Sequence, residues 1–203
     1  MKPAPRELRA LARRDPRLGR AMARVEPFPG FPARGHYQSH FHALASAIVY
    51  QQLAGKAART IHDRVARLTP GSRFPNAEQV LGLRKAKLRG AGLSAAKTEA
   101  IRDLARKTSD GSVRLRALAG KDDEAVIEEL VRIRGIGVWS AQMFLMFRLG
   151  RLDVMPAADL GIQEGLRRLD RLAERPKPAE VLERAEVWQP LRSVASWVLW
   201  RLT

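Results

Sequence analysis

Two glycines separated by one isoleucine, Gly135-Ile136-Gly137, are the part of this sequence that most directly suggests chemistry. They lie between two amphipathic segments, and glycine allows the backbone torsions of a tight hairpin while leaving its outer face without a side chain. The segment after them begins with backbone N–H groups that have no partner within a helix and attract anions. With Arg132 or Arg134 alongside, the hairpin predicts a contact with one phosphate group, and an ordinary helical hairpin is the alternative.

The charge of the chain favours the phosphate interpretation. Its 203 residues include 37 Lys and Arg against 21 Asp and Glu, a formal net charge of +16. A sequence pI near 11.4 on a folded domain is typical of a protein that binds a polyanion. The basic residues are spread along the chain and do not line one apolar helix, so we expect nucleic acid as the partner and no membrane surface.

The composition excludes several kinds of site. The chain has no cysteine, which excludes disulfides, thiolate zinc sites, cysteine nucleophiles and cysteine-ligated iron–sulfur clusters. The four histidines, His36, His40, His42 and His62, lack carboxylate neighbours at metal-ligand spacing, so we expect no metal site and no cofactor. No apolar run approaches the roughly 20 residues of a membrane span, and the first residues lack a signal-peptide core. We therefore expect a soluble, cytoplasmic protein.

One carboxylate and two indoles are candidates for a functional site, and each also has a purely structural alternative. Asp159 precedes the apolar Leu160 and Ile162, where an aspartate most often caps a helix, so catalysis is the less common alternative from the residues alone. Only 6% of the residues are aromatic. Trp200 lies about opposite the apolar stripe of the last helical segment, and Trp139 follows the hairpin. Each could line a pocket or pack against a neighbouring helix.

Helical periodicity dominates the chain and alternating β-branched runs are absent, which predicts an all-α fold. A polar elbow at 50–55 is expected to join two helices, and a helix is expected from about Val138 to Leu149. Helix starts are marked at Asp15-Pro16, Ser39, Pro75-Asn76, Ser94, Asp122-Asp123, Asp159, Pro178 and Leu191. The clearest core stripes are Phe41, Leu44, Ala45, Ile48 and Val49, and Leu191, Val194, Ala195, Val198, Leu199 and Leu202.

Several motifs, in one order, resemble the helix-hairpin-helix (HhH-GPD) DNA glycosylases, specifically the alkylpurine, or 3-methyladenine, branch. These motifs are AIVYQQLAGKAARTIHDRV, GLSAAKTEAIRDLA, GIGVWSAQMF, LDVMPAADLGIQ and VWQPLRSVASWVLW, and the resemblance covers about 41–203. It implies two helical lobes flanking a DNA-binding cleft. One lobe would be about 40–155, including a helix-hairpin-helix at 123–149, and the other 1–39 plus 156–203. Larger bacterial relatives carry an N-terminal β-rich domain, for which this chain is too short.

The resemblance also implies an activity. We expect a monomeric enzyme that hydrolyses the N-glycosidic bond of alkylated purines, of the 3-methyladenine and 7-methylguanine class, in double-stranded DNA during base excision repair. The family's catalytic aspartate matches Asp159, and many relatives carry a second acid where this chain has Ala158. Bifunctional relatives carry a Schiff-base lysine where this chain has Trp139, so base removal without strand cleavage is expected. A non-catalytic binder of distorted DNA is the rival hypothesis.

The remaining site residues also come from the resemblance. Trp139 and Trp200 match pocket residues, Met143 stands where some relatives have a pocket tyrosine, and Tyr50 would line the pocket mouth or simply pack. Gln51, Gln52 and Leu53 match an intercalating loop with Gln52 as the wedge, although Gln51 and Gln52 could instead satisfy backbone groups where two helices meet. The expected phosphate contacts are Arg134, Gly135, Ile136, Gly137 and Ser140, with a possible monovalent ion at the carbonyl oxygens of Ile133 and Ile136.

Overall fold

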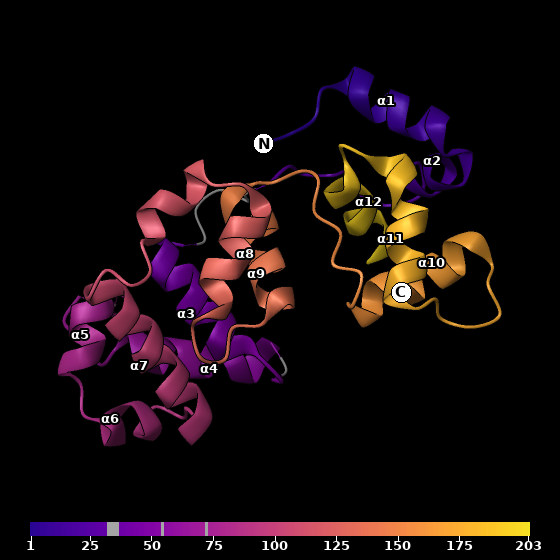
Figure 1. Cartoon of the computed structure of the whole chain (residues 1–203). Helices are drawn as coiled ribbons and strands as arrows, with labels where there is room; N and C mark the ends of the chain where they lie inside the picture. The colour runs from indigo at the N-terminus through magenta and orange to yellow at the C-terminus, as the bar shows by residue number, and fades with distance from the viewer. Residues whose placement is uncertain (32–36, 54, 72) are drawn as a thin grey trace. The chain divides into compact units, whose positions relative to one another are not determined.

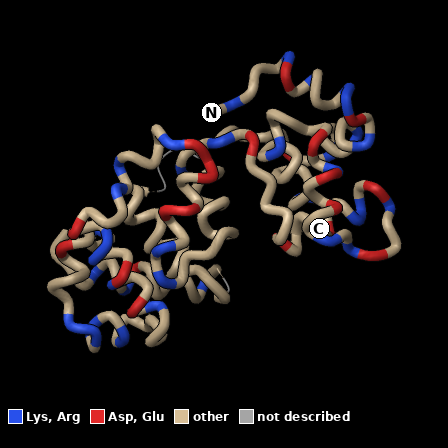
Figure 2. Tube along the Cα trace, viewed as in Figure 1, with Lys and Arg blue, Asp and Glu red and all other residues tan. Residues whose placement is uncertain are grey.

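The computed structural model describes residues 1–31, 37–53, 55–71 and 73–203 (Figure 1). All secondary structure in these ranges is helical, which confirms the all-α prediction. The chain forms two compact units, which we call unit 1 (Met1–Arg34 with Leu145–Thr203) and unit 2 (Gly35–Phe144). The lobes expected from the sequence divide after residues 39 and 155, whereas these units divide after residues 34 and 144. Lys and Arg are spread over both units (Figure 2). None of the described helices combines the length and hydropathy that crossing a bilayer requires.

Unit 2 is built around one buried helix, α3 (His40–Tyr50). The predicted stripe from Phe41 to Val49 is buried, and Ser39 caps the helix by accepting the backbone N–H of His42 at 3.0 Å. Helices α4 (Gly55–Ala66), α7 (Ala95–Ser109) and α9 (Val138–Phe144) and the 3₁₀ turn η1 (Leu115–Gly120) pack against α3. The other elements of unit 2 are α4 (Gly55–Ala66), α5 (Ala77–Gly82), α6 (Lys85–Gly90), α7 (Ala95–Ser109), η1 (Leu115–Gly120), α8 (Asp123–Val131) and α9 (Val138–Phe144).

Unit 1 is held together by the packing of α12 (Arg192–Leu199) against α10 (Leu160–Asp170) and α2 (Pro16–Met22). The closest approach is at Gly165 of α10, where an added Cβ would lie 2.2 Å from the carbonyl oxygen of Leu199. Only glycine fits at that point. The elements of unit 1 are α1 (Pro5–Arg14), α2 (Pro16–Met22), the π-helical turn η2 (Leu145–Leu149), α10 (Leu160–Asp170), α11 (Pro178–Ala185), the 3₁₀ turn η3 (Glu186–Trp188) and α12 (Arg192–Leu199).

Three helix predictions need correction. Helix α1 was not expected, because its apolar stripe is short; Pro5 at its first position and the carboxylate of Glu7, which accepts the Ala4 N–H at 2.6 Å, define its start. The helix expected from Val138 to Leu149 is α-helical only to Phe144 and ends in the π-helical turn. The last helix ends at Leu199, so Leu202 lies beyond it and is only half-buried.

A buried carboxylate joins α2 to α11 and η3. Asp15 is 5% exposed, and its Oδ1 accepts the backbone N–H groups of Arg17 and Leu18, each at 3.0 Å, as the predicted cap of α2. Its Oδ2 accepts from Arg184 Nη2 at 2.6 Å and from Trp188 Nε1 at 2.7 Å. Burial alone would raise the pKa of Asp15, but the Leu18 N–H, the Trp188 indole and the Arg184 guanidinium outweigh it and hold the pKa below its ordinary value.

We expect Asp15→Asn to lower the free energy of unfolding at pH 7 by roughly 1–3 kcal/mol, because it removes one of the two carboxylates that pair with the partly buried guanidinium of Arg184. The pKa is lower in the folded state, so the contribution of Asp15 is complete above the unfolded value and is lost as pH falls through the folded one. The difference in the free energy of unfolding between parent and variant, measured with urea, should therefore become smaller below about pH 4. The exposed Glu128→Gln is the control and should cost under about 0.5 kcal/mol; an Asp15→Asn variant as stable as the parent at pH 7 would show that the carboxylate does not join these helices.

Candidate functional site

The hairpin between α8 and α9 is anchored from inside and open outside. Ile133 and Ile136 are buried, and the N–H of Ile136 donates to the carbonyl oxygen of Ile133 at 3.0 Å, which leaves that oxygen one further lone pair. Gly135 has a φ of +79°, and an added Cβ there would lie 3.0 Å from Cβ of Ala100. Gly137 has open space around it. The first glycine is therefore required by the backbone, while the second leaves the outer face of the hairpin uncovered.

A carboxylate on α7 holds the hairpin from the side, which the sequence did not predict. Asp103 Oδ2 accepts the backbone N–H of Arg134 at 2.9 Å, and the same carboxylate pairs with Lys107 at 2.9 Å and with Arg106. Lys107 also donates to the carbonyl oxygen of Arg132. Partial burial would raise the pKa of Asp103, but the Arg134 N–H and the two cations outweigh it and lower the pKa.

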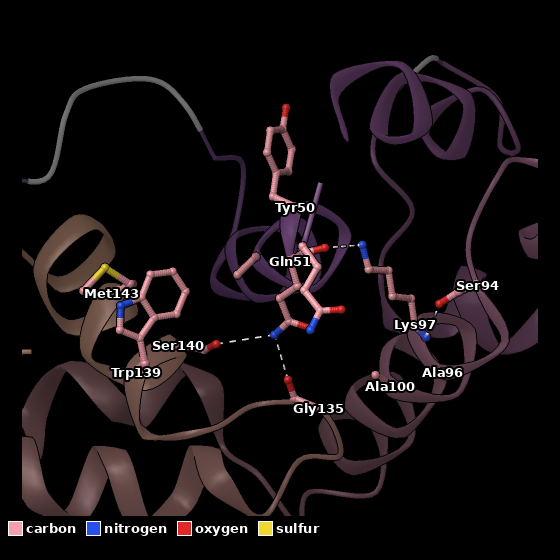
Figure 3. Close-up of a pocket in the computed structure, with 12 residues that line it drawn as sticks. Tyr50, Gln51, Ser94, Ala96, Lys97, Ala100, Gly135, Trp139, Ser140 and Met143 are labelled. Carbon is pink, nitrogen blue, oxygen red and sulfur yellow. Dashed lines mark hydrogen bonds between the residues drawn. The ribbon is translucent and has the colours of Figure 1, made fainter. Parts of the chain in front are cut away.

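The elbow after α3 is tied to both the hairpin and α7 (Figure 3). The side-chain amide of Gln51 donates to the carbonyl oxygen of Gly135 at 2.8 Å and to Ser140 Oγ at 3.4 Å. Lys97 Nζ donates to the carbonyl oxygens of Val49 at 2.8 Å and Gln51 at 2.6 Å, and burial lowers the pKa of this lysine. The side chain of Gln51 therefore binds a backbone carbonyl group, which was the alternative to a role in the intercalating loop. Ser140, expected at a phosphate, is 6% exposed and faces this amide.

The two residues after Gln51 are presented to solvent. Gln52 is exposed with a φ of +54°, a left-handed conformation that costs a non-glycine residue about 1 kcal/mol. The side chain of Leu53 is 38% exposed, and Ala54 lies outside the described residues. Strain of this kind in an exposed turn is a pointer to function. The wedge role stays a prediction, and Gln52 and Leu53 are the residues positioned for it.

A cavity of about 550 Å³ in unit 2 brings most of the expected pocket and elbow residues together. Tyr50 is 41% exposed and Trp139 is 45% exposed, so neither ring is part of the core. Trp139 and Met143 lie one turn apart on α9 and share a face (Figure 3). A flat, apolar group that enters this cavity would meet aromatic surface and one ammonium group. Its lining residues are Ala47, Tyr50, Gln51, Gln52, Ser94, Ala96, Lys97, Ala100, Gly135, Trp139, Ser140 and Met143.

The candidate catalytic carboxylate lies in unit 1 and is held by an indole. Asp159 caps α10, with Oδ1 accepting the backbone N–H of Ile162 at 2.9 Å. The same oxygen accepts Trp200 Nε1–H, also at 2.9 Å, and the Trp200 ring stacks on Phe147 with centroids 5.9 Å apart. Both Asp159 and Trp200 remain partly exposed. The cap and the indole together fix the direction of the carboxylate.

Gly161 makes room for that hydrogen bond. A Cβ on Gly161 would lie 2.9 Å from Trp200 Cδ1 and 3.0 Å from Asp159 Oδ1. Any side chain at this position must therefore push the indole away from the carboxylate. The signal was present in the sequence, because a glycine stands in the first turn of an otherwise regular helix, but its partner Trp200 lies 39 residues later.

The described residues hold no group of three or more acidic, histidine or cysteine side chains that could bind a metal ion. His36, considered as a ligand in the sequence, lies outside the described ranges.

Comparison with known proteins gives the family. A family model described as "HhH-GPD superfamily base excision DNA repair protein" matches residues 45–190. The chain belongs to this superfamily. A curated relative from Schizosaccharomyces pombe, "DNA-3-methyladenine glycosylase 1", is 36% identical over 162 residues, 79% of this chain and 71% of the relative.

Two solved structures are similar to nearly the whole chain. The S. pombe 3-methyladenine DNA glycosylase Mag1, in complex with abasic DNA, matches with a TM-score of 0.86 and 32% identity, covering 97% of this chain and 95% of that one. The DNA-3-methyladenine glycosidase from Bacillus halodurans matches with a TM-score of 0.83 and 35% identity, covering 98% and 88%. The predicted HhH-GPD fold is thereby confirmed.

The expected site residues of this HhH-GPD chain fall into two sets. Unit 2 contains the elbow, the hairpin and the pocket residues Tyr50, Trp139 and Met143, whereas unit 1 contains Asp159 and Trp200. The residues that position this site were not predicted from the sequence: Lys97, Asp103 and Gly161. The catalytic, pocket and phosphate roles of the expected site residues remain predictions.

We expect Gly161→Ala to break the Trp200–Asp159 hydrogen bond, because the new methyl group occupies the space of the indole edge. The indole N–H resonance of Trp200, identified by its loss in Trp200→Phe, should shift upfield and exchange faster with solvent. Gly82→Ala on α5 is the matched control, since a Cβ at that helical glycine meets nothing within 4 Å. An unchanged Trp200 indole resonance in Gly161→Ala would show that the glycine is not needed there.

Proposed function

We propose that this chain is a DNA glycosylase that removes alkylated purines, such as 3-methyladenine and 7-methylguanine, from double-stranded DNA without cutting the strand. The observation that carries the proposal is the carboxylate of Asp159, held partly exposed by the α10 cap and by Trp200. It stands in the segment that matches the family's catalytic aspartate. The names of the relatives, DNA-3-methyladenine glycosylases from yeast and bacteria, support the same substrate class.

The chemistry needs one well-placed negative charge. Alkylation of a purine ring nitrogen makes the base a cation, which leaves readily and needs little general-acid help. Positive charge then develops on the sugar, as in other glycoside hydrolyses, and a carboxylate beside it stabilises that charge. At about 4 Å and an effective dielectric constant near 20, the attraction is about 4 kcal/mol, or about a thousandfold in rate. Asp159 is the residue that we assign to this role.

The aromatic cavity of unit 2 would receive the base. Extruding a nucleotide from the duplex costs a few kcal/mol, and damaged pairs cost less. Stacking on Trp139 and Tyr50 offsets part of this cost, with a cation–π contribution for a charged purine. Both rings line the cavity and are partly exposed. Met143 offers a softer, less directional surface than a tyrosine would.

The elbow and the hairpin would hold the DNA. Gln52 is our candidate for the wedge that fills the space of the extruded base, because it is exposed and its backbone is fixed in an unusual conformation. The open outer face at Gly137 and the side chain of Arg134 are the candidate contacts to one phosphate. Phosphate contacts of this kind position the duplex without reading its sequence.

We expect Asp159→Asn to reduce the release of 3-methyladenine from a methylated duplex at least about a thousandfold. Asparagine caps helices as well as aspartate does, so the fold and the affinity for an abasic-site duplex should change little. Free-base chromatography in single turnover measures base release, and fluorescence anisotropy measures the affinity for the abasic-site duplex. Asp122→Asn, the same change at the cap of α8, is the control and should leave base release unchanged. Parental activity in Asp159→Asn, or no base release by the parent, would favour a non-catalytic DNA binder.

We expect borohydride to trap no covalent adduct between the protein and DNA after base removal, and the strand to break only on alkali treatment. The position of the Schiff-base lysine in bifunctional relatives holds Trp139, which has no amine. The amine of Lys97 also lines the cavity, but it already donates to two carbonyl oxygens. A trapped adduct would contradict the proposal, and its loss in Lys97→Met would assign the amine to Lys97.

A further inference from the structure

A hollow lined by arginines lies in unit 1, between α2 and the C-terminal end of α10. Its volume is about 410 Å³, and no acidic side chain is among its lining residues. Three small or apolar side chains form the rest of the wall. The lining residues are Arg17, Arg20, Ala21, Arg24, Arg168, Leu169, Arg171 and Leu202.

Two of these arginines have protein partners. Arg17 pairs with Asp170 at 3.1 Å, and Arg168 pairs with Glu164 at 2.9 Å while donating to the carbonyl oxygens of Leu202 and Thr203. In contrast, no ion pair with a described carboxylate involves Arg20, Arg24 or Arg171. Three guanidinium groups thus border one hollow without a neutralising group.

The helix dipoles do not account for all of this charge. A cation in the last turn of a helix is stabilised by the negative end of the dipole, which explains Arg20 on α2 and Arg168 on α10. Arg24 lies beyond the end of α2. Arg171 lies at the C-terminal cap of α10 with a φ of +58°, where glycine or asparagine is the usual residue. The dipole also favours a cation at this end of α10, but glycine or asparagine adopts the left-handed conformation at lower cost.

We propose that this hollow binds a phosphate group. The planar guanidinium matches phosphate oxygens with paired hydrogen bonds, and several arginines around one anion relieve their mutual repulsion. The phosphate would come from the DNA strand or from a small phosphorylated ligand. Helix α10 separates the hollow from Asp159 by eleven residues, or about 17 Å, the axial rise of about five nucleotides of one strand. The DNA source rests on the proposed function, whereas phosphate binding itself does not.

The DNA source is tested with the triple variant Arg20→Gln, Arg24→Gln, Arg171→Gln. Anisotropy titrations use an uncleavable abasic analogue at the centre of a duplex of about 30 base pairs and of one of about 8, which is too short to reach the hollow. For the long duplex we expect at least fivefold weaker binding and a salt slope smaller by about 1, since one phosphate contact is lost. For the short duplex we expect no change. The control is Arg6→Gln, Arg9→Gln, Arg13→Gln on α1, which changes the net charge equally.

The small-ligand source is tested with inorganic pyrophosphate and the melting temperature of the same three proteins. Pyrophosphate should raise the Tm of the parent and of the α1 control, but not of the triple variant, if a small ligand fills the hollow. An equal loss of DNA affinity in the α1 control would exclude the DNA source. The proposal is overturned if, in addition, pyrophosphate raises the Tm of the triple variant as much as that of the parent, or if the triple variant matches the parent with both probes. Because these readouts measure binding alone, they remain interpretable if the chain releases no base.

Discussion

The close approach of α10 and α12 is the contact on which the candidate catalytic centre depends. Gly165 lets the carbonyl oxygen of Leu199 come so near that any Cβ would overlap it, and Trp200 follows directly at the end of α12. One turn earlier on the same face of α10, Gly161 leaves space for the Trp200 indole to reach Asp159. Each glycine costs a helix about 1 kcal/mol relative to alanine. Two glycines nevertheless occur within five residues of α10. Gly165 sets the separation of the two helices, and Gly161 sets the direction of the carboxylate.

Unit 2 follows a different principle, in which polar side chains bind backbone groups to hold exposed loops. Gln51 joins the elbow to the hairpin, Lys97 joins it to α7, and Asp103 joins the hairpin to α7. Each of these bonds ends on a main-chain group that no helix satisfies, so the loops do not need apolar cores of their own. Tyr50, Gln52 and Trp139 can therefore stay exposed around a preformed cavity. Little conformational entropy of these loops then remains to be lost when a ligand binds.

The sequence predicted what depends on neighbours along the chain. Helix caps at Asp15, Ser39 and Asp159, and the buried stripe of α3, follow from residue type and a spacing of three or four, and the structure confirms them. Contacts between distant segments were beyond that reasoning. Lys97 meets Gln51 across 46 residues, and Asp103 meets Arg134 across 31. Their partners are backbone atoms, which every residue possesses, so no pairing of residue types marks them. The resemblance to a family supplied the candidate site residues, and the structure supplied the reasons for their positions.

The hydrogen bonds of Asp159 also bear on which chemistry it suits. Its Oδ1 accepts two N–H groups, which fix the direction of the carboxylate. Its main contribution would be a fixed negative charge, which is what a developing sugar cation needs. A base that is already cationic needs no second acid to leave, whereas a neutral base would need one. Ala158, where many relatives carry an acid, is therefore compatible with alkylated purines and unfavourable for neutral lesions. A single oriented carboxylate can stabilise the sugar cation, and a charged base leaves without a second acid, so both features suit the same mechanism.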